Sequence, residues 1–129
     1  MPLVRIDVVE GRTEEGLRRL VDAVQGVMLD VFSAPDRDRY QVIHEHKPGR
    51  IVAEDTGLGF ERTDDVVIIQ LTQQGRTEDQ KRALYAGLAD RLREKIGLAP
   101  SDLIVCVTEN ARADWSFGMG RAQFLEGDL

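Results

Sequence analysis

The chain has 129 residues and a net charge of −6, and 42% of its residues are hydrophobic. This length predicts one domain over residues 1–129, with enough apolar side chains for a core. The acidic balance argues against nucleic-acid binding, which requires a surplus of lysine and arginine. We also expect no membrane partner and a cytoplasmic location, because no apolar run approaches a bilayer span and the first residues do not resemble a signal peptide.

The first half of the chain predicts a strand, a helix and a second strand, in that order. The apolar run 3–9 predicts the first strand, and residues 39–44 predict the second. Between them, Thr13 is a candidate N-cap and Ala34-Pro35 ends the helix. The helix is indicated by apolar residues at steps of three and four positions: Leu17, Leu20, Val21, Val24, Val27, Met28 and Val31.

The second half repeats this order, because Gly-Arg-Thr-Glu-Glu at 11–15 recurs as Gly-Arg-Thr-Glu-Asp at 75–79. Thr77 with Gln80 predicts a capping box at the start of the second helix. The predicted elements are a strand at 66–72, a helix with Leu84, Leu88, Leu92 and Ile96 that stops before Ala99-Pro100, and a strand at 103–108. The sequence therefore predicts a mixed α+β fold of two tandem β-α-β units, about 2–62 and 66–129, with parallel strands in each.

A cysteine, a pair of histidines and a glycine-containing loop could each belong to a functional site, but the sequence favours a structural role for all three. The single cysteine, Cys106, excludes an internal disulfide, and its place in the apolar run 103–107 predicts a buried, unreactive thiol. His44 and His46 share a strand face, but no third ligand stands at a suitable spacing, so we expect no metal site. Gly57-Leu58-Gly59 predicts a turn rather than a dinucleotide-binding loop, and we expect no cofactor.

A proline directly after Met1, at the start of a β-α-β unit, resembles the tautomerase superfamily, and further segments resemble its malonate semialdehyde decarboxylase branch. These segments are 35–40 (PDRDRY), 42–46 (VIHEH), 55–62 (DTGLGFER), 113–118 (ADWSFG) and 127–129 (GDL). The resemblance implies a tautomerase/MIF-like fold and a homotrimer arranged around a shared barrel. It also implies a cofactor-independent carboxy-lyase that converts malonate semialdehyde to acetaldehyde and CO2.

The resemblance also implies roles for individual residues. Pro2 is expected to be catalytic, Asp38 to be its partner, and Arg76 to bind the carboxylate of the substrate. Gln74 stands where the family pattern has a second arginine. The residues expected to wall the pocket with apolar surface are Trp115, Phe117, Phe124 and Leu129.

The chemistry of Pro2 depends on a free amine, and we expect Met1 to be removed because residue 2 is small. A free α-amino group has a pKa of about 8, so it can be a cation or an amine at neutral pH. As an ammonium, Pro2 could hydrogen-bond the aldehyde oxygen, and as an amine it could form an iminium; the sequence leaves both open. The structural alternatives are a proline that starts an edge strand and, for Asp38, a solvated loop carboxylate.

Gln74 carries no charge, so the pocket should hold a carboxylate less strongly than a two-arginine version. We therefore hypothesise that decarboxylation is retained and that hydration of unsaturated acids is weakened. Arg76 precedes a helix, where free N–H groups favour anions, although Arg12 has the equivalent place in the first unit and is interpreted as structural. The alternatives to the decarboxylase are a keto–enol tautomerase with neutral Pro2 as base, a haloacrylate dehalogenase or hydratase, and a non-catalytic binding module.

Overall fold

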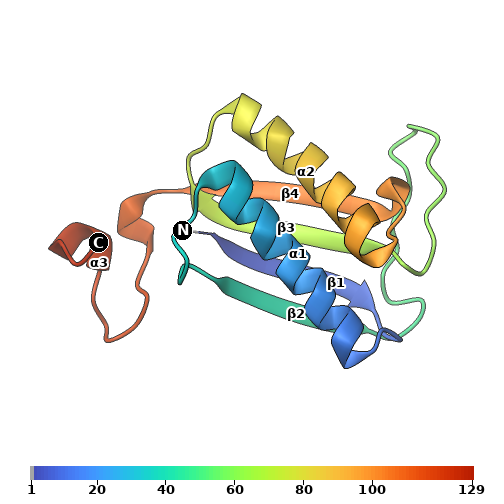
Figure 1. The fold of residues 1–129 in the computed structure, drawn as a ribbon, viewed down its shortest axis with the longest axis horizontal. Helices are drawn as coiled ribbons and strands as arrows, with labels where there is room; N and C mark the ends of the chain where they lie inside the picture. The colour runs from blue at the N-terminus through green and yellow to red at the C-terminus, as the bar shows by residue number, and fades with distance from the viewer. Residues whose placement is uncertain (1) are drawn as a thin grey trace.

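The computed structural model describes residues 2–129 and shows a four-stranded sheet with two long helices on one face (Figure 1). The strand order is β2-β1-β3-β4, with β1 at Leu3–Val9, β2 at Tyr40–His46, β3 at Val67–Gln74 and β4 at Leu103–Asn110. β1 runs parallel to β2, and β3 runs parallel to β4, as predicted. The two pairs join through an antiparallel β1–β3 contact, so the start of β1 lies beside the end of β3.

The two long helices begin at the predicted N-caps. α1 spans Glu14–Phe32 and α2 spans Glu78–Ile96. The Thr13 hydroxyl accepts a hydrogen bond from a backbone N–H of the first turn, and Thr77 forms the predicted capping box with Gln80. Ser33 and Gly97 end the helices in the left-handed conformation that closes a helix C-terminus.

The helices cover one face of the sheet and enclose a single apolar core. Fully buried residues of the strands and helices form it, among them Val4, Ile6, Val8, Ile69, Leu71, Leu20, Val24, Met28, Leu84, Leu88 and Leu92. Each such side chain contributes about 1.5–3 kcal/mol by burial. Gly87 lets the helices approach closely, because a Cβ there would lie 3.2 Å from Val27 Cγ1.

No helix covers the opposite face of the sheet in the described part of the chain (Figure 1). On this face His46 Nε2 hydrogen-bonds Asp7 Oδ1 at 2.6 Å, and an Arg5 guanidinium nitrogen lies 3.1 Å from His44 Nε2. Cys106 is exposed, so the prediction of a buried thiol is wrong. The apolar run around it suggested a strand covered on both faces, whereas only one face of β4 is covered.

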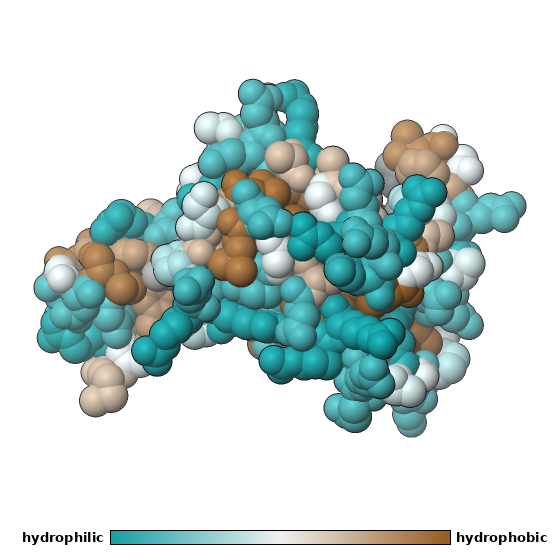
Figure 2. Space-filling view, in the orientation of Figure 1, coloured by the Kyte–Doolittle hydropathy of each residue, from teal (hydrophilic) through white to brown (hydrophobic). Residues whose placement is uncertain are grey.

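The loop at 47–66 and the C-terminal segment at 111–129, here called the tail, extend beyond opposite ends of the sheet (Figure 1). Three short helices complete the chain: η1 at Pro100–Asp102, η2 at Arg112–Asp114 and α3 at Gln123–Glu126. Figure 2 shows apolar surface at both extensions, and the exposed side chains there are Val52, Leu58, Phe60, Met119, Leu125 and Leu129. Among residues 2–129, no helix has the length and hydropathy needed to cross a bilayer.

Candidate active site

The antiparallel β1–β3 contact brings four segments to one end of the sheet. β1 begins there directly after Pro2, and β2 begins there two residues after Asp38. β3 and β4 end there, two residues before Arg76 and Arg112. In Figure 1 this is the end marked N, from which the tail leaves the body. Side chains far apart in the sequence therefore meet at this end.

A pocket of about 320 Å³ opens at this end of the sheet. The end of α1 and the loop after it supply Phe32, Ser33, Ala34, Pro35 and Asp38, while the ends of the strands and the tail supply Gln74, Arg76, Arg112 and Phe124. One acid, one amide and two guanidinium groups thus share a small space with two aromatic rings. This composition suits a small anionic ligand.

Arg76 and its counterpart in the first unit have different surroundings. The Arg76 guanidinium lies over the ring of Phe32, 4.9 Å from its centroid, and Arg76 Nε is buried with no hydrogen-bond partner among residues 2–129. Arg12 instead donates a hydrogen bond to the backbone oxygen of Asp65 at 2.8 Å. Arg12 therefore ties the first helix to a loop, as its structural interpretation predicted, while Arg76 lines the pocket.

Asp38 is buried at the pocket wall, with only 4% of its surface exposed. Its backbone N–H donates to the oxygen of Pro35 at 3.0 Å, and the buried Gln25 donates to its backbone oxygen at 3.4 Å. Burial raises the pKa of the Asp38 carboxyl, and the nearby positive charge of Arg76 opposes that rise. The backbone of Asp38 is therefore fixed by hydrogen bonds and its carboxyl is removed from water, so Asp38 is not a solvated loop residue.

A second, more apolar pocket of about 370 Å³ adjoins the first and shares Pro35 and Asp38 with it. Its other lining residues are Arg37, Tyr40, Phe117, Gln123, Asp128 and Leu129. The Phe117 ring stacks on Tyr40 and on Trp115, with centroids 5.5 and 5.3 Å apart, and meets Phe124 edge-on at 5.5 Å. Offset and edge-to-face pairs of this kind hold aromatic rings in place.

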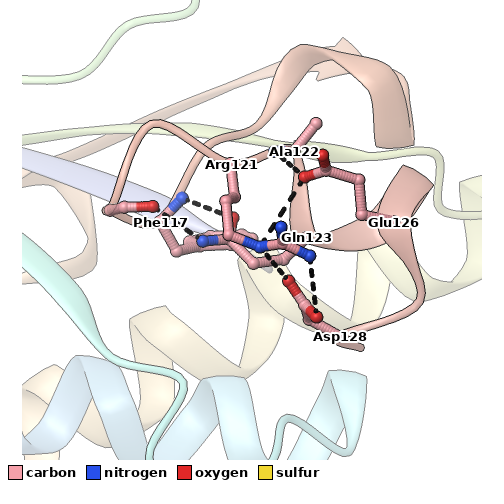
Figure 3. Close-up of polar contacts among 7 residues, drawn as sticks. Phe117, Arg121, Ala122, Gln123, Glu126 and Asp128 are labelled. Atoms are coloured by element: carbon pink, nitrogen blue, oxygen red, sulfur yellow. Dashed lines mark hydrogen bonds and ion pairs between the residues drawn. The ribbon is translucent and has the colours of Figure 1, made fainter.

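The tail holds this aromatic wall through its own polar contacts (Figure 3). Gln123 accepts from the N–H of Phe117 at 2.9 Å and donates to the oxygen of Gly118 at 2.8 Å. Arg121 Nε donates to Asp128 at 2.8 Å, and Trp115 Nε1 donates to Asn110 at the end of β4 at 2.8 Å. Hydrogen bonds and an ion pair within the tail therefore fix its shape, and Trp115 and Phe117 attach it to the sheet at Asn110 and Tyr40.

Pro2 is buried directly before β1, which is an interior strand. The alternative of a proline opening an edge strand therefore does not hold, and a position at the very start of a strand is one that an interior strand tolerates for proline. The β1–β3 register pairs Leu3 with Thr72, and one step further it sets Pro2 opposite Gln73. The Gln73 amide is fully buried and has no hydrogen-bond partner among residues 2–129.

The structure brings together most of the predicted site residues. Asp38, Gln74, Arg76 and Phe124 line the first pocket, and Phe117 and Leu129 line the second. Trp115 lines neither and supports Phe117 from behind, while Pro2 is buried at the same end of the sheet without lining either pocket. The predicted removal of Met1 concerns a residue outside 2–129.

Arg112, Gln25 and Gln73 were missed by sequence reasoning. Arg112 had a detectable signal, because it follows the last predicted strand as Arg76 follows the third. Gln25 and Gln73 had none, since a glutamine within an apolar pattern does not show what it will contact. Among residues 2–129, no cluster of three metal-ligating side chains occurs.

Two family models described as tautomerase enzyme match the chain, one over residues 38–118 and the other over 2–61. Two curated relatives come from Bacillus subtilis (strain 168). The probable tautomerase YrdN is 47% identical over the whole of both chains. The probable tautomerase YusQ is 35% identical over 98% of this chain and all of its own.

Two similar solved structures are malonate semialdehyde decarboxylases. One, known in wild-type, mutant and inactivated forms, is 46% identical over 98% of each chain with a TM-score of 0.96. The other, inhibited by 3-bromopropiolate, is 44% identical over 98% of this chain and 97% of its own, with a TM-score of 0.95. A fused 4-OT, solved as a symmetric trimer, shares the fold with a TM-score of 0.78 at 20% identity over 97% of this chain and 98% of its own.

Proposed function

This chain belongs to the tautomerase superfamily, and we propose that it decarboxylates malonate semialdehyde to acetaldehyde and CO2 with the amine of Pro2, freed by removal of Met1. One observation carries the proposal: Asp38 and Arg76 line one small pocket at the end of the sheet where β1 begins after Pro2. Its support is the 46% identity to a malonate semialdehyde decarboxylase over nearly the whole chain.

Pro2 acts on the aldehyde of the substrate, while Arg76 orients the carboxylate. The bond between the α-carbon and the carboxyl carbon breaks, CO2 leaves, and the electron pair moves toward the aldehyde oxygen to give an enolate. A protonated Pro2 stabilises this enolate by a hydrogen bond. A neutral Pro2 instead attacks the aldehyde carbon and forms an iminium with loss of water, and this iminium accepts the electron pair to give an enamine. Protonation of the α-carbon gives acetaldehyde directly in the first route. In the second route it gives the iminium of acetaldehyde, which water hydrolyses to acetaldehyde and free Pro2.

Asp38 and the aromatic wall complete the proposed site. An ionised Asp38 near Pro2 raises the pKa of the amine and favours its cationic form. The wall formed by Trp115, Phe117, Phe124 and Leu129 excludes water from the carboxylate, and loss of hydration favours departure of neutral CO2. Arg76 then needs only to orient the carboxylate, because tight binding of the charged ground state would not lower the barrier.

Borohydride reduction separates the two routes. In the presence of malonate semialdehyde, an iminium would be trapped as a covalent adduct on Pro2, which mass spectrometry detects. The hydrogen-bond route predicts unmodified protein after borohydride treatment, and full turnover in a parallel reaction without borohydride, because borohydride itself reduces aldehydes. Absence of both an adduct and acetaldehyde would contradict the proposed decarboxylase itself.

Gln74 is proposed to weaken hydration of acetylenic acids without abolishing decarboxylation. Hydration draws negative charge onto the carboxylate, so it needs more cationic stabilisation than decarboxylation does. We expect Gln74→Arg to raise hydration by about tenfold, the effect of one charge-assisted hydrogen bond, and to change acetaldehyde formation much less. Steady-state rates of both reactions check this, and equal hydration by the two proteins would refute it.

A keto–enol tautomerase is the second candidate, because YrdN and YusQ are named probable tautomerases. In that reaction neutral Pro2 takes a proton from carbon, so activity would require a deprotonated amine at pH 7. Comparing kcat/KM for malonate semialdehyde with that for an arylpyruvate enol discriminates the two candidates. A larger value for the enol would favour the tautomerase.

We also propose that the protein is a homotrimer. This assembly is supported by the uncovered face of the sheet and by the exposed apolar side chains of the loop at 47–66 and of the tail. A fused 4-OT of the same fold is a trimer.

A further inference from the structure

Arg112 occupies the same position after β4 that Arg76 occupies after β3. The two strands are parallel, and their last paired residues are Gln74 and Asn110. Arg76 and Arg112 lie two residues beyond the ends of β3 and β4, and both line the pocket of about 320 Å³. Arg112 thus lines the pocket from the tail, and the uncharged side chain of Gln74 lines the same pocket from β3.

Both guanidinium groups are held against aromatic rings. The Arg112 guanidinium lies over Phe124 at 4.7 Å from the ring centroid, as that of Arg76 lies over Phe32 at 4.9 Å. Stacking of this kind orients a guanidinium while leaving its N–H edge available to an anion. Among the described residues that line this pocket, Asp38 is the one acid, while Asp114 beside Arg112 accepts a hydrogen bond from the backbone of Ala111.

Arg76 and Arg112 thus bring two positive charges to a pocket whose lining has one acid, Asp38, and an anion bound between the two guanidinium groups would lower their mutual repulsion. We propose that Arg112 is a second carboxylate-binding residue of this site, supplied by the tail rather than by β3, where Gln74 carries no charge. The inference deepens the proposed function and rests on the same pocket. A monocarboxylate is then bound from two sides, by Arg76 from β3 and by Arg112 from the tail, so substrate binding also draws the tail toward the body.

The test measures binding without turnover. Isothermal titration of 3-hydroxypropanoate, an unreactive three-carbon acid, is compared with its uncharged amide. We expect Arg112→Gln to weaken binding of the acid by roughly ten- to hundredfold, the range for hydrogen bonds to charged groups. Binding of the amide should be unaffected. The affinity of Arg112→Lys for the acid should lie between those of the wild type and Arg112→Gln, because lysine keeps the positive charge but lacks the planar guanidinium that binds a carboxylate through two hydrogen bonds.

Controls separate this role from docking of the tail. Arg82 is exposed on α2 and lines neither pocket of the candidate site, so Arg82→Gln should bind the acid as the wild type does. Trp115 is the chain's single tryptophan and stacks on Phe117, so its fluorescence reports whether the tail stays in place. In Arg112→Gln, Gln74→Arg should restore selectivity for the acid, since it returns a cation to the pocket.

Three results would overturn the inference: no acid binding by the wild type, unchanged acid binding by Arg112→Gln, or equal weakening of acid and amide. The last would mean that Arg112 only docks the tail. If the acid is bound selectively through Arg112 while malonate semialdehyde is not turned over, the inference stands and the proposed decarboxylase fails.

Discussion

Asp38 shows how the fold sets the surroundings of a single residue of the candidate site. It follows the helix stop at Pro35, is buried, and has its backbone fixed by hydrogen bonds to Pro35 and Gln25. Because burial raises its pKa, folding favours the protonated carboxyl. The stability from this group is fully present below the unfolded pKa of about 3.9 and is lost as the pH rises through the raised native pKa.

Asp38→Asn should therefore separate stability from activity. At pH 7.5 the variant should have a higher free energy of unfolding than the wild type, because it no longer buries a charge, and this gain should disappear at pH 4. Its decarboxylation rate should fall by about a hundredfold or more. Urea denaturation at both pH values and an acetaldehyde assay check this, with the exposed Asp36→Asn as control. A less stable Asp38→Asn protein at pH 7.5 would contradict the account.

At the scale of elements, local chemistry predicted the helices and strands well. Thr13 and Thr77 mark the true helix starts, and the strand predicted at 3–9 matches β1. The predicted ends of the other strands differ by up to two residues, since polar residues such as Gln73 and Gln74 continue β3 without an apolar signal. Local pattern determines whether a segment is helix or strand, but packing decides where it ends.

Contacts between distant elements were less predictable. The antiparallel β1–β3 pair, which builds the candidate site, joins segments far apart in the chain and has no short-range signal. For the same reason the exposed face of β4 and the entry of Arg112 into the pocket appeared only in the structure. Asp38, Gln74 and Arg76 were predicted as site residues through family resemblance rather than from their own spacing.

The tail is the element whose role is most readily tested by mutation. Gln123→Met keeps the side-chain length but removes the hydrogen bonds to Phe117 and Gly118, each worth about 1 kcal/mol. We expect kcat/KM to fall by about tenfold with the thermal unfolding midpoint nearly unchanged, because the tail lies outside the core. Trp115 fluorescence should shift as the wall loosens.

Arg121→Gln provides the control for the tail, because it removes only exposed ion pairs, with Asp128 and Glu126. Such pairs contribute about 0–1 kcal/mol, so its kcat/KM should change less than that of Gln123→Met. Equal activity of Gln123→Met and the wild type would show that the wall does not need this contact.

At the scale of the whole molecule, both β-α-β units contribute to one apolar core. This supports our proposal that the chain is a single domain with an internal repeat. The uncovered sheet face remains to be explained, and the proposed trimer explains it by covering that face with other subunits. Cys106, the only cysteine, lies on this face and can report on the assembly.

Thiol labelling of Cys106 should therefore depend on assembly. At micromolar concentration we expect sedimentation as a trimer and labelling at least about tenfold slower than in urea-unfolded protein, because neighbouring subunits cover the thiol. Dilution that dissociates the trimer should accelerate labelling. A monomer by sedimentation, with labelling as fast as that of the unfolded chain, would contradict the proposed assembly.

The central claim is that the amine of Pro2 performs the decarboxylation. The most direct test measures acetaldehyde formation from malonate semialdehyde by protein whose loss of Met1 has been verified by mass spectrometry, for the wild type and for Pro2→Ala. The account predicts turnover by the wild type and a loss of about a hundredfold or more in a folded Pro2→Ala protein. An inactive wild type, or a Pro2→Ala protein that keeps the full rate, would contradict it.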